Sequence, residues 1–176
     1  MDVLTFERLK KLQSSQGKDF GKIVQQLLGI AFCRLGFRRT EDRLVEGVDF
    51  DFVRGTEKLA VEVKTTQGDA VALAEKDIDG LARRQADGYL PLVAALQTGT
   101  LSDWVIARSE SLRPGSIPFS SLSSLKHAVL EADINRLFPD VVTQYSGEIE
   151  RERRGKGITR ISAILNRECS NNALKI

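Results

Sequence analysis

Three carboxylates and a lysine lie close together in the stretch EGVDFDFVRGTEKLAVEVKTT, residues 46–66, among residues typical of β-strands. They are Asp49, Asp51, Glu62 and Lys64. Carboxylate oxygens are the ligands that Mg²⁺ prefers, and an ammonium group can stabilise negative charge on a phosphate or position the attacking water. These residue types therefore point to metal-assisted hydrolysis of a phosphodiester bond.

The segment RGTE, residues 54–57, predicts a two-residue hairpin turn of type II′, because its first central residue is a glycine that accepts a positive φ. With that turn, Asp49 lies opposite Glu62, while Asp51 lies opposite Ala60. Alternation along the strands places both aspartates, Glu62 and Lys64 on one face. The other face is then an apolar core face: Val48, Phe50, Phe52, Leu59, Val61 and Val63.

Directly opposed carboxylates destabilise a strand pair unless something compensates their charge. A divalent cation bound by Asp49 and Glu62 would do so, and Lys64 would then lie beside a metal-bound water or a phosphate oxygen. The alternative is a hairpin whose polar face is solvated, with salt bridges from Lys64 balancing the acids. The Glu-x-Lys spacing alone does not separate the two interpretations, because an acid two residues before a lysine arises easily by chance.

The composition is that of one globular domain: 176 residues, 41% hydrophobic and 28% charged, with a formal net charge of +2. No apolar run reaches the roughly 18 residues of a membrane span, and the first residues lack a signal-peptide core. We therefore expect a cytoplasmic protein. Two cysteines do not suggest a disulfide framework, and the helical pattern around Cys33 predicts a buried, reduced thiol, with Cys169 far away in sequence.

Several kinds of chemistry have no support. The single histidine, His127, lies in a helical stretch and is expected to be partly exposed, so a structural zinc site is implausible. Neither a phosphate-binding P-loop nor a G-x-G-x-x-G turn is present, so no nucleotide cofactor is expected. A G-x-S-x-G nucleophile elbow is also absent.

Hydrophobic periodicity predicts the elements that would position the acidic residues. The expected helices cover residues 2–13, 19–35, 70–87 and 120–138, the last of them ended by Phe138-Pro139, with a possible short helix near the end of the chain. The expected strands cover residues 37–45, 48–53, 58–64, 90–96 and 104–108, and residues 111–119 are expected to form a loop. This order predicts an α/β fold with a mixed central sheet flanked by helices.

The stretch GVDFDFVRGTEKLAVEVKTT resembles the signature of the PD-(D/E)xK, or restriction-endonuclease-like, nucleases: an aspartate at a strand start, a hairpin, then E-x-K. The matching residues are Asp49, Glu62 and Lys64, and the predicted order matches the family's αβββαβ core over roughly residues 17–108. The first helix, GKDFGKIVQQLLGIAFCRLGF, is most similar to the archaeal Holliday-junction resolvase and Mrr-like branches.

The resemblance implies a metal-dependent endonuclease acting on DNA, with Mg²⁺ or Mn²⁺ bound by Asp49, Glu62 and Val63, which offers only its main chain. It implies restriction-like or branched-DNA cleavage, and cutting two strands would require a homodimer. Residues 1–140 would form the nuclease-like domain. Residues 141–176 would be a basic extension that contacts DNA or forms the dimer.

Two positions depart from the family pattern. Val48 replaces the proline before the aspartate, and Gly21 replaces the first-helix glutamate that often completes metal binding. Gln25, one turn further on, could substitute as a neutral ligand or through water, with Asp51 and Gln85 as auxiliary residues. Gln85 could equally be a solvated helix-end residue. Gly21 keeps open an alternative function, a weakened nuclease-fold protein that binds nucleic acid or a partner without cutting.

Basic residues occur in three groups that could contact phosphates. Each group could equally be a solvated face, and glutamates interleaved in the last group also fit a salt-bridged helix. The candidate DNA contacts are Arg38, Arg39, Arg83, Arg84, Arg151, Arg153, Arg154 and Lys156.

Overall fold

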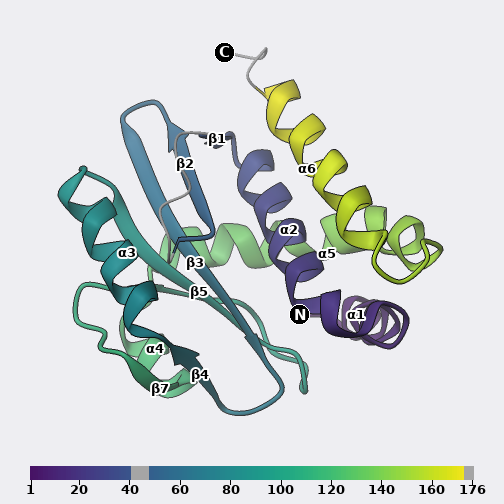
Figure 1. The fold of residues 1–176 in the computed structure, drawn as a ribbon, viewed down its shortest axis with the longest axis horizontal. Coiled ribbons are helices and arrows are strands. Elements are labelled where there is room, and N and C mark those ends of the chain that lie inside the picture. Colours follow the sequence, from purple (N-terminus) through teal and green to yellow (C-terminus); the bar gives the residue numbers. More distant parts are fainter. Residues whose placement is uncertain (41–47, 173–176) are drawn as a thin grey trace.

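A computed structural model describes residues 1–40 and 48–172. Its centre is a five-stranded sheet in the order β1-β2-β3-β5-β6, in which β3 and β5 run parallel and the other neighbours are antiparallel (Figure 1). Its strands are β1 (Arg38–Arg39), β2 (Phe50–Arg54), β3 (Glu57–Thr66), β5 (Leu90–Gln97) and β6 (Val105–Arg108). A second, two-stranded antiparallel sheet consists of β4 (Ala70–Leu73) and β7 (Gly115–Pro118).

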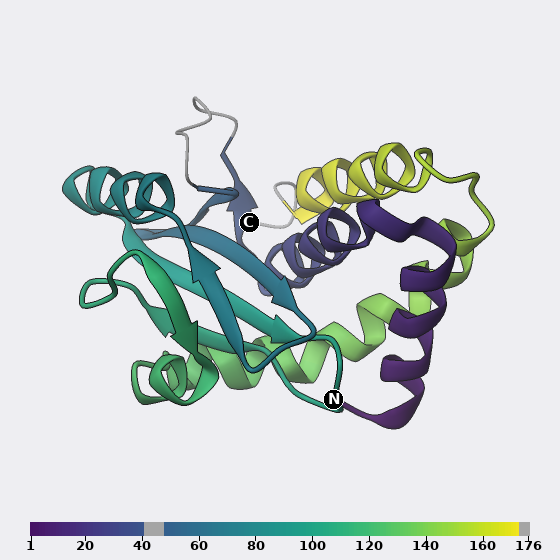
Figure 2. The same cartoon turned by 60° about the horizontal axis from the view of Figure 1, so that its bottom comes forward.

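Helices cover both faces of the central sheet, as Figure 2 shows. One hydrophobic cluster joins the sheet to α1 (Val3–Gln16), α2 (Phe20–Arg34), α5 (Ala128–Glu150) and α6 (Gly157–Asn172), with the short 3₁₀ helix η1 (Gly17–Asp19) between α1 and α2. A second cluster joins the opposite face to the small sheet, α3 (Glu75–Ala86) and α4 (Phe119–Ser124). This is the predicted α/β architecture, with α2, β1–β3, α3 and β5 in the αβββαβ order.

Strand β5 is buried on both faces, as its continuous apolar sequence predicted. Leu92 and Ala94 pack in the cluster beneath α2, whereas Val93 and Ala95 pack in the cluster beneath α3. Helix α2 is apolar almost all round because it is enclosed by the sheet, α5 and α6. The strand that bears the acidic residues is therefore held against a packed core.

The hairpin register is confirmed. Phe50 pairs with Val61, Asp51 with Ala60 and Arg54 with Glu57, and the turn glycine Gly55 has φ 59°. The apolar face is also confirmed except at Val48, which packs against the cluster on the α3 side. The ladder starts only at Phe50, so strand alternation does not extend to residue 48. Residues 41–47, part of which was expected to continue the first strand, lie outside the described residues.

The helix expected over residues 70–87 is wrong in its first turn. Residues 70–73 form β4 and pair with β7, which lies in the segment expected to be a loop. Val71 and Leu73 are buried while Ala72 is exposed, so this segment has strand periodicity. A four-residue apolar run is too short for periodicity to separate strand from helix.

The helix expected over residues 120–138 is two helices. Helix α4 ends at Ser124, and α5 starts after His127, whose Nδ1 accepts a hydrogen bond from the Leu130 N–H at 3.4 Å. The expected stop at Pro139 is wrong, because α5 continues to Glu150. Proline removes one helical hydrogen bond, and burial of apolar residues on both sides of it offsets that loss. The expected domain boundary at residue 140 falls inside this helix.

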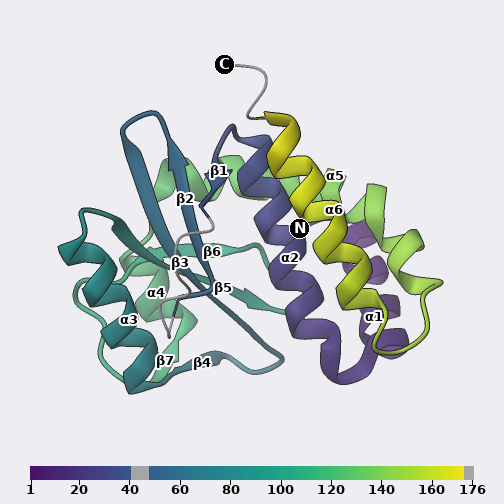
Figure 3. The ribbon, with the colours of Figure 1, turned by 45° about the horizontal axis from the view of Figure 1, so that its top comes forward.

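Helix α6 is longer than the short helix expected, and it lies along α2 (Figure 3). Gly29 permits close approach, since a Cβ there would lie 3.1 Å from Leu165 Cδ1. The two cysteines are joined as a Cys33–Cys169 disulfide, so the expected reduced thiol at Cys33 is wrong. Helix packing brings together residues that are 136 positions apart, which no local pattern reveals. Among the described helices, none is both long and apolar enough to cross a membrane.

Candidate active site

Asp49 lies where the β2–β3 ladder ends. Its N–H donates to the Val61 carbonyl at 3.1 Å, and its carboxylate accepts from the Val63 N–H at 2.8 Å. The side chain of Gln25, on α2, also hydrogen-bonds this carboxylate. The extended register had predicted that Asp49 faces Glu62 in the ladder. That prediction is wrong, because the regular pairing ends at Phe50 and Val61. The Asp49 carboxylate instead replaces a main-chain acceptor beside Glu62.

Glu62 and Lys64 project from β3 and meet Asp77, which comes from the first turn of α3. Lys64 Nζ lies 2.7 Å from Glu62 Oε1 and 2.6 Å from Asp77 Oδ2. The side chains of Glu62 and Asp77 are 7% and 4% exposed, whereas that of Lys64 is 24% exposed. The ammonium is thus partly open to solvent while both of its carboxylate partners are buried.

Burial is the main cause of the pKa shifts at the site. Burial raises the pKa of Glu62 to about 7, with the nearby charge of Asp49 also raising it and Lys64 opposing the shift. Burial raises the pKa of Asp49 too, against the Val63 hydrogen bond, the charge of Lys64 and the Gln25 hydrogen bond. Ionising both carboxylates at once is therefore unfavourable without an additional cation.

Asp51 is separated from this group, although it shares the same face. It is 9% exposed and forms a salt bridge with Arg84 of α3, while its Oδ1 is buried without a hydrogen-bond partner among the described residues. Burial raises the pKa of Asp51 despite the guanidinium. The polar hairpin face is therefore covered by α3, which contradicts the solvated alternative for Asp51 and Glu62.

Helix α3 carries the candidate residues Arg84 and Gln85. Arg84, expected to contact DNA, is 8% exposed and engaged with Asp51, because its helix packs this side on the sheet. Gln85, expected near the site, is exposed, since Asp77, Leu81 and Arg84 form the buried side of α3. The residue that α3 does contribute is Asp77, which sequence reasoning missed. The sequence did contain a signal: Asp77 precedes the apolar Leu81 by four residues, a spacing that puts both on the same side of a helix.

The start of α2 lies beside β3. A Cβ on Gly21 would be 3.3 Å from the Thr65 Oγ1, so the position of the missing glutamate faces the site strand closely. Gln25, one turn later, contacts Asp49 as described above. The helix thus contributes an amide rather than an acid.

The carboxylates of Asp49 and Glu62 suit a hard divalent cation, which prefers oxygen ligands. Their pKa values are raised mainly by burial, and a bound cation would favour their charged forms. Within residues 1–40 and 48–172, no group of three or more acidic, histidine or cysteine side chains is arranged to hold a metal. The chemistry of Asp49 and Glu62 fits Mg²⁺ or Mn²⁺, although they are only two charged ligands.

The other basic candidates are at the surface. Arg38 is exposed and the Arg39 guanidinium lies 5.4 Å from the centroid of the Phe50 ring, on the edge strand β1. Arg83 is exposed on α3. Arg154 donates to the carbonyls of Ser15 and Ser14, at 3.1 and 3.2 Å respectively. That contact ties the segment between α5 and α6 to the end of α1.

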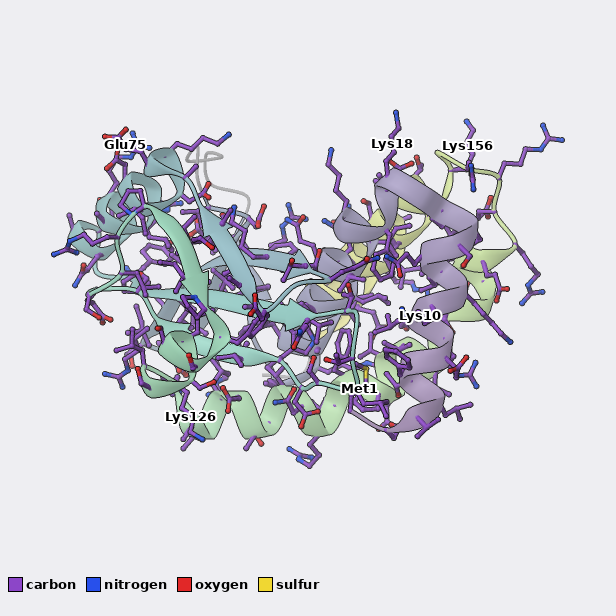
Figure 4. All side chains as sticks on the ribbon, turned by 90° about the horizontal axis from the view of Figure 1, so that it is seen from below. Met1, Lys10, Lys18, Glu75, Lys126 and Lys156 are labelled. Carbon is purple, nitrogen blue, oxygen red and sulfur yellow. A yellow bond between two sulfur atoms is a disulfide. The ribbon has the colours of Figure 1, made fainter. Side chains whose placement is uncertain are left out.

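The segment between α5 and α6 also exposes Arg151, Arg153 and Lys156, and Arg151 Nε donates to the Gly147 carbonyl at 2.8 Å. Figure 4 shows Lys156 at the same end of the molecule as Lys18. Basic side chains of η1 and of the segment between α5 and α6 therefore lie at the same end of the molecule.

The αβββαβ core and the hairpin geometry define the restriction-endonuclease-like fold. The chain is structurally similar to Hjc, a Holliday junction resolvase from the archaeal hyperthermophile Archaeoglobus fulgidus, with a TM-score of 0.52 and 19% sequence identity. The match covers 64% of this chain and 95% of the Hjc chain. No family model and no curated protein matches this chain. The likeness confirms the predicted fold.

Proposed function

We propose that this protein is a metal-dependent nuclease that hydrolyses phosphodiester bonds in DNA. The observation that carries the proposal is the convergence of Asp49, Glu62 and Lys64 at the end of one hairpin, in a fold shared with a Holliday junction resolvase. Branched DNA is therefore the first substrate to test, with linear duplex and single-stranded DNA beside it.

In this proposal, Asp49, Glu62 and the main-chain carbonyl of Val63 would hold Mg²⁺ or Mn²⁺. The bound cation would neutralise charge on the phosphate and lower the pKa of a coordinated water. Gln25 keeps the Asp49 carboxylate oriented by its hydrogen bond. The Lys64 ammonium, partly open to solvent, would contact a phosphate oxygen and stabilise its developing negative charge.

The duplex would contact exposed basic side chains at the surface through its phosphates. The candidates after removal of Arg84 are Arg38, Arg39, Arg83, Arg151, Arg153, Arg154 and Lys156. One site cuts one strand, so paired cuts would require a homodimer. Light scattering of the purified protein, with and without junction DNA, measures whether it is a monomer or a dimer.

The decisive experiment is cleavage of a four-way junction, plasmid and single-stranded DNA with Mg²⁺, Mn²⁺ or EDTA. We expect metal-dependent cleavage by the wild type and a loss of about 100-fold or more for Lys64→Ala. Lys58→Ala, an exposed lysine on the same strand, is the matched control and retains activity. Cleavage by Lys64→Ala at the wild-type rate would assign the activity to another site or to a contaminant.

A second candidate function is binding of nucleic acid without cleavage, which Gly21 and the small number of acidic ligands favour. Calorimetry with Mn²⁺ separates the candidates. A nuclease site binds Mn²⁺ in the wild type and loses that binding in Glu62→Ala. Junction DNA bound in EDTA, combined with equal Mn²⁺ binding by both proteins, would support the second function.

A further inference from the structure

Lys64 is held by two carboxylates that belong to different elements. Glu62 shares its strand, whereas Asp77 approaches from α3. Asp77 Oδ2 also accepts a hydrogen bond from the Ala74 N–H at 2.9 Å, at the start of that helix. A buried carboxylate that is fixed by the helix start is a rigid anchor for a flexible lysine.

We propose that Asp77 is a positioning residue that keeps the Lys64 ammonium at the site when Glu62 binds a metal. This inference rests on the proposed nuclease function and adds to it a residue outside the D…E-x-K pattern. In the metal-free protein Glu62 and Lys64 are direct partners. A cation on Glu62 would withdraw its negative charge from Lys64, and Asp77 would remain as the charged acceptor.

Without Asp77, the four-carbon lysine side chain would have only Glu62 to hold it, and the same carboxylate is the candidate metal ligand. The ammonium and the metal would then compete for one group. With Asp77 present, the two carboxylates can divide the two cations between them. Its burial, at 4% side-chain exposure, strengthens the interaction, because water screens it little.

A purely structural role, as the acceptor for the Ala74 N–H, is the competing explanation. Asp77→Asn separates the two, since an asparagine Oδ1 still accepts that hydrogen bond but carries no charge. Asp79→Asn is the matched control, because Asp79 is an exposed acid two residues further along the same helix.

The first test uses metal-free protein at pH 8 and does not depend on activity. Thermal unfolding is compared for the wild type, Asp77→Asn, Lys64→Met and the double variant. We expect Asp77→Asn to lower the Tm by about 5 °C with Lys64 present and by much less with Met at position 64. An equal loss in both backgrounds would mean that the Asp77 charge does not act through Lys64, and would overturn the inference.

The second test measures junction cleavage. We expect Asp77→Asn to lower kcat at least about tenfold while the KM for DNA stays within about twofold, and Asp79→Asn to change neither. An unchanged kcat overturns the inference. A wild-type protein that cleaves no substrate would overturn the proposed function instead, and the thermal comparison would still decide whether Asp77 holds Lys64.

Discussion

The carboxylate of Asp49 accepts the main-chain N–H of Val63 at 2.8 Å, just beyond the last pair of the β2–β3 ladder. A side chain thereby takes the place that a main-chain carbonyl would occupy in a continuing strand. Because Val63 follows Glu62 directly, this bond fixes one acid relative to the other through the backbone. Two carboxylates that repel each other are held together by the sheet.

Glu62 makes the stability of the metal-free protein depend on pH. Its pKa is raised from 4.5 to about 7 in the fold, so the native state binds more protons than the unfolded chain between these values. This stabilising contribution is fully present below pH 4.5 and is lost as the pH rises through about 7. Over that interval we expect a loss of about 3 kcal/mol in the free energy of unfolding.

Urea denaturation in EDTA from pH 4.5 to 8.5 measures this loss, and Glu62→Gln is the comparison protein because it cannot titrate. Asp49 and Asp51 also have raised pKa values, and their contributions largely cancel between the two proteins. A stability difference that does not change with pH would contradict the assigned pKa of Glu62.

The buried pair of Asp51 and Arg84 attaches α3 to β2. Arg84→Met leaves the Asp51 charge buried and unpaired, so we expect a loss of about 3–5 kcal/mol in urea denaturation. The double variant Asp51→Asn, Arg84→Met should recover part of that loss. Lys76→Met, at an exposed position of the same helix, serves as the control and should stay within about 0.5 kcal/mol of the wild type.

Two glycines at the α5–α6 corner should respond oppositely to alanine. A Cβ on Gly157 would lie 2.5 Å from Gln16 Oε1, and the Gln16 amide donates to the carbonyls of Ile149 and Glu152. Gly157→Ala should therefore cost about 1–3 kcal/mol. A Cβ on Gly147 would meet no neighbouring atom of the described residues within 4 Å, so Gly147→Ala should gain about 0.5–1 kcal/mol. Thermal and urea unfolding of both variants measure these changes. A free energy of unfolding that rises in Gly157→Ala, as it should in Gly147→Ala, would refute the packing role of Gly157.

The Cys33–Cys169 disulfide predicts a difference between oxidised and reduced protein. Cys169→Ser should lower the free energy of unfolding by about 2–5 kcal/mol, because the bond closes a long loop in the unfolded chain. Dithiothreitol should reproduce that loss in the wild type and have no effect on the variant. Thiol titration of the denatured wild type checks the state directly, and two free thiols per chain without reductant would contradict the bond.

The hairpin was predictable because a glycine turn and a period of two fix its register with local information alone. The same holds for β5, whose unbroken apolar run indicates burial on both faces. The fold class followed from the order of these elements. The placement of Glu62 and Lys64 on one face of β3 follows from the same alternation. Asp49 lies just beyond the last paired residue of β2, so its contact with the Val63 N–H could not be read from the register.

Other residues were misassigned or missed because their positions depend on contacts between segments that lie far apart in the sequence. Charged residues on a helix are usually solvated, and only the packing of α3 makes Arg84 and Asp77 internal. Continuation of α5 through Pro139 likewise depends on the core on either side of it. A short apolar run such as residues 70–73 becomes a strand only when β7 provides a partner.

The disulfide has a topological consequence for the whole chain. Residues 33–169 form a closed covalent ring, and both strands of the candidate site belong to it. A protease that cuts one peptide bond inside the ring would open it without releasing either fragment. The nicked protein would keep its full mass under denaturing conditions and would separate into two pieces only after reduction.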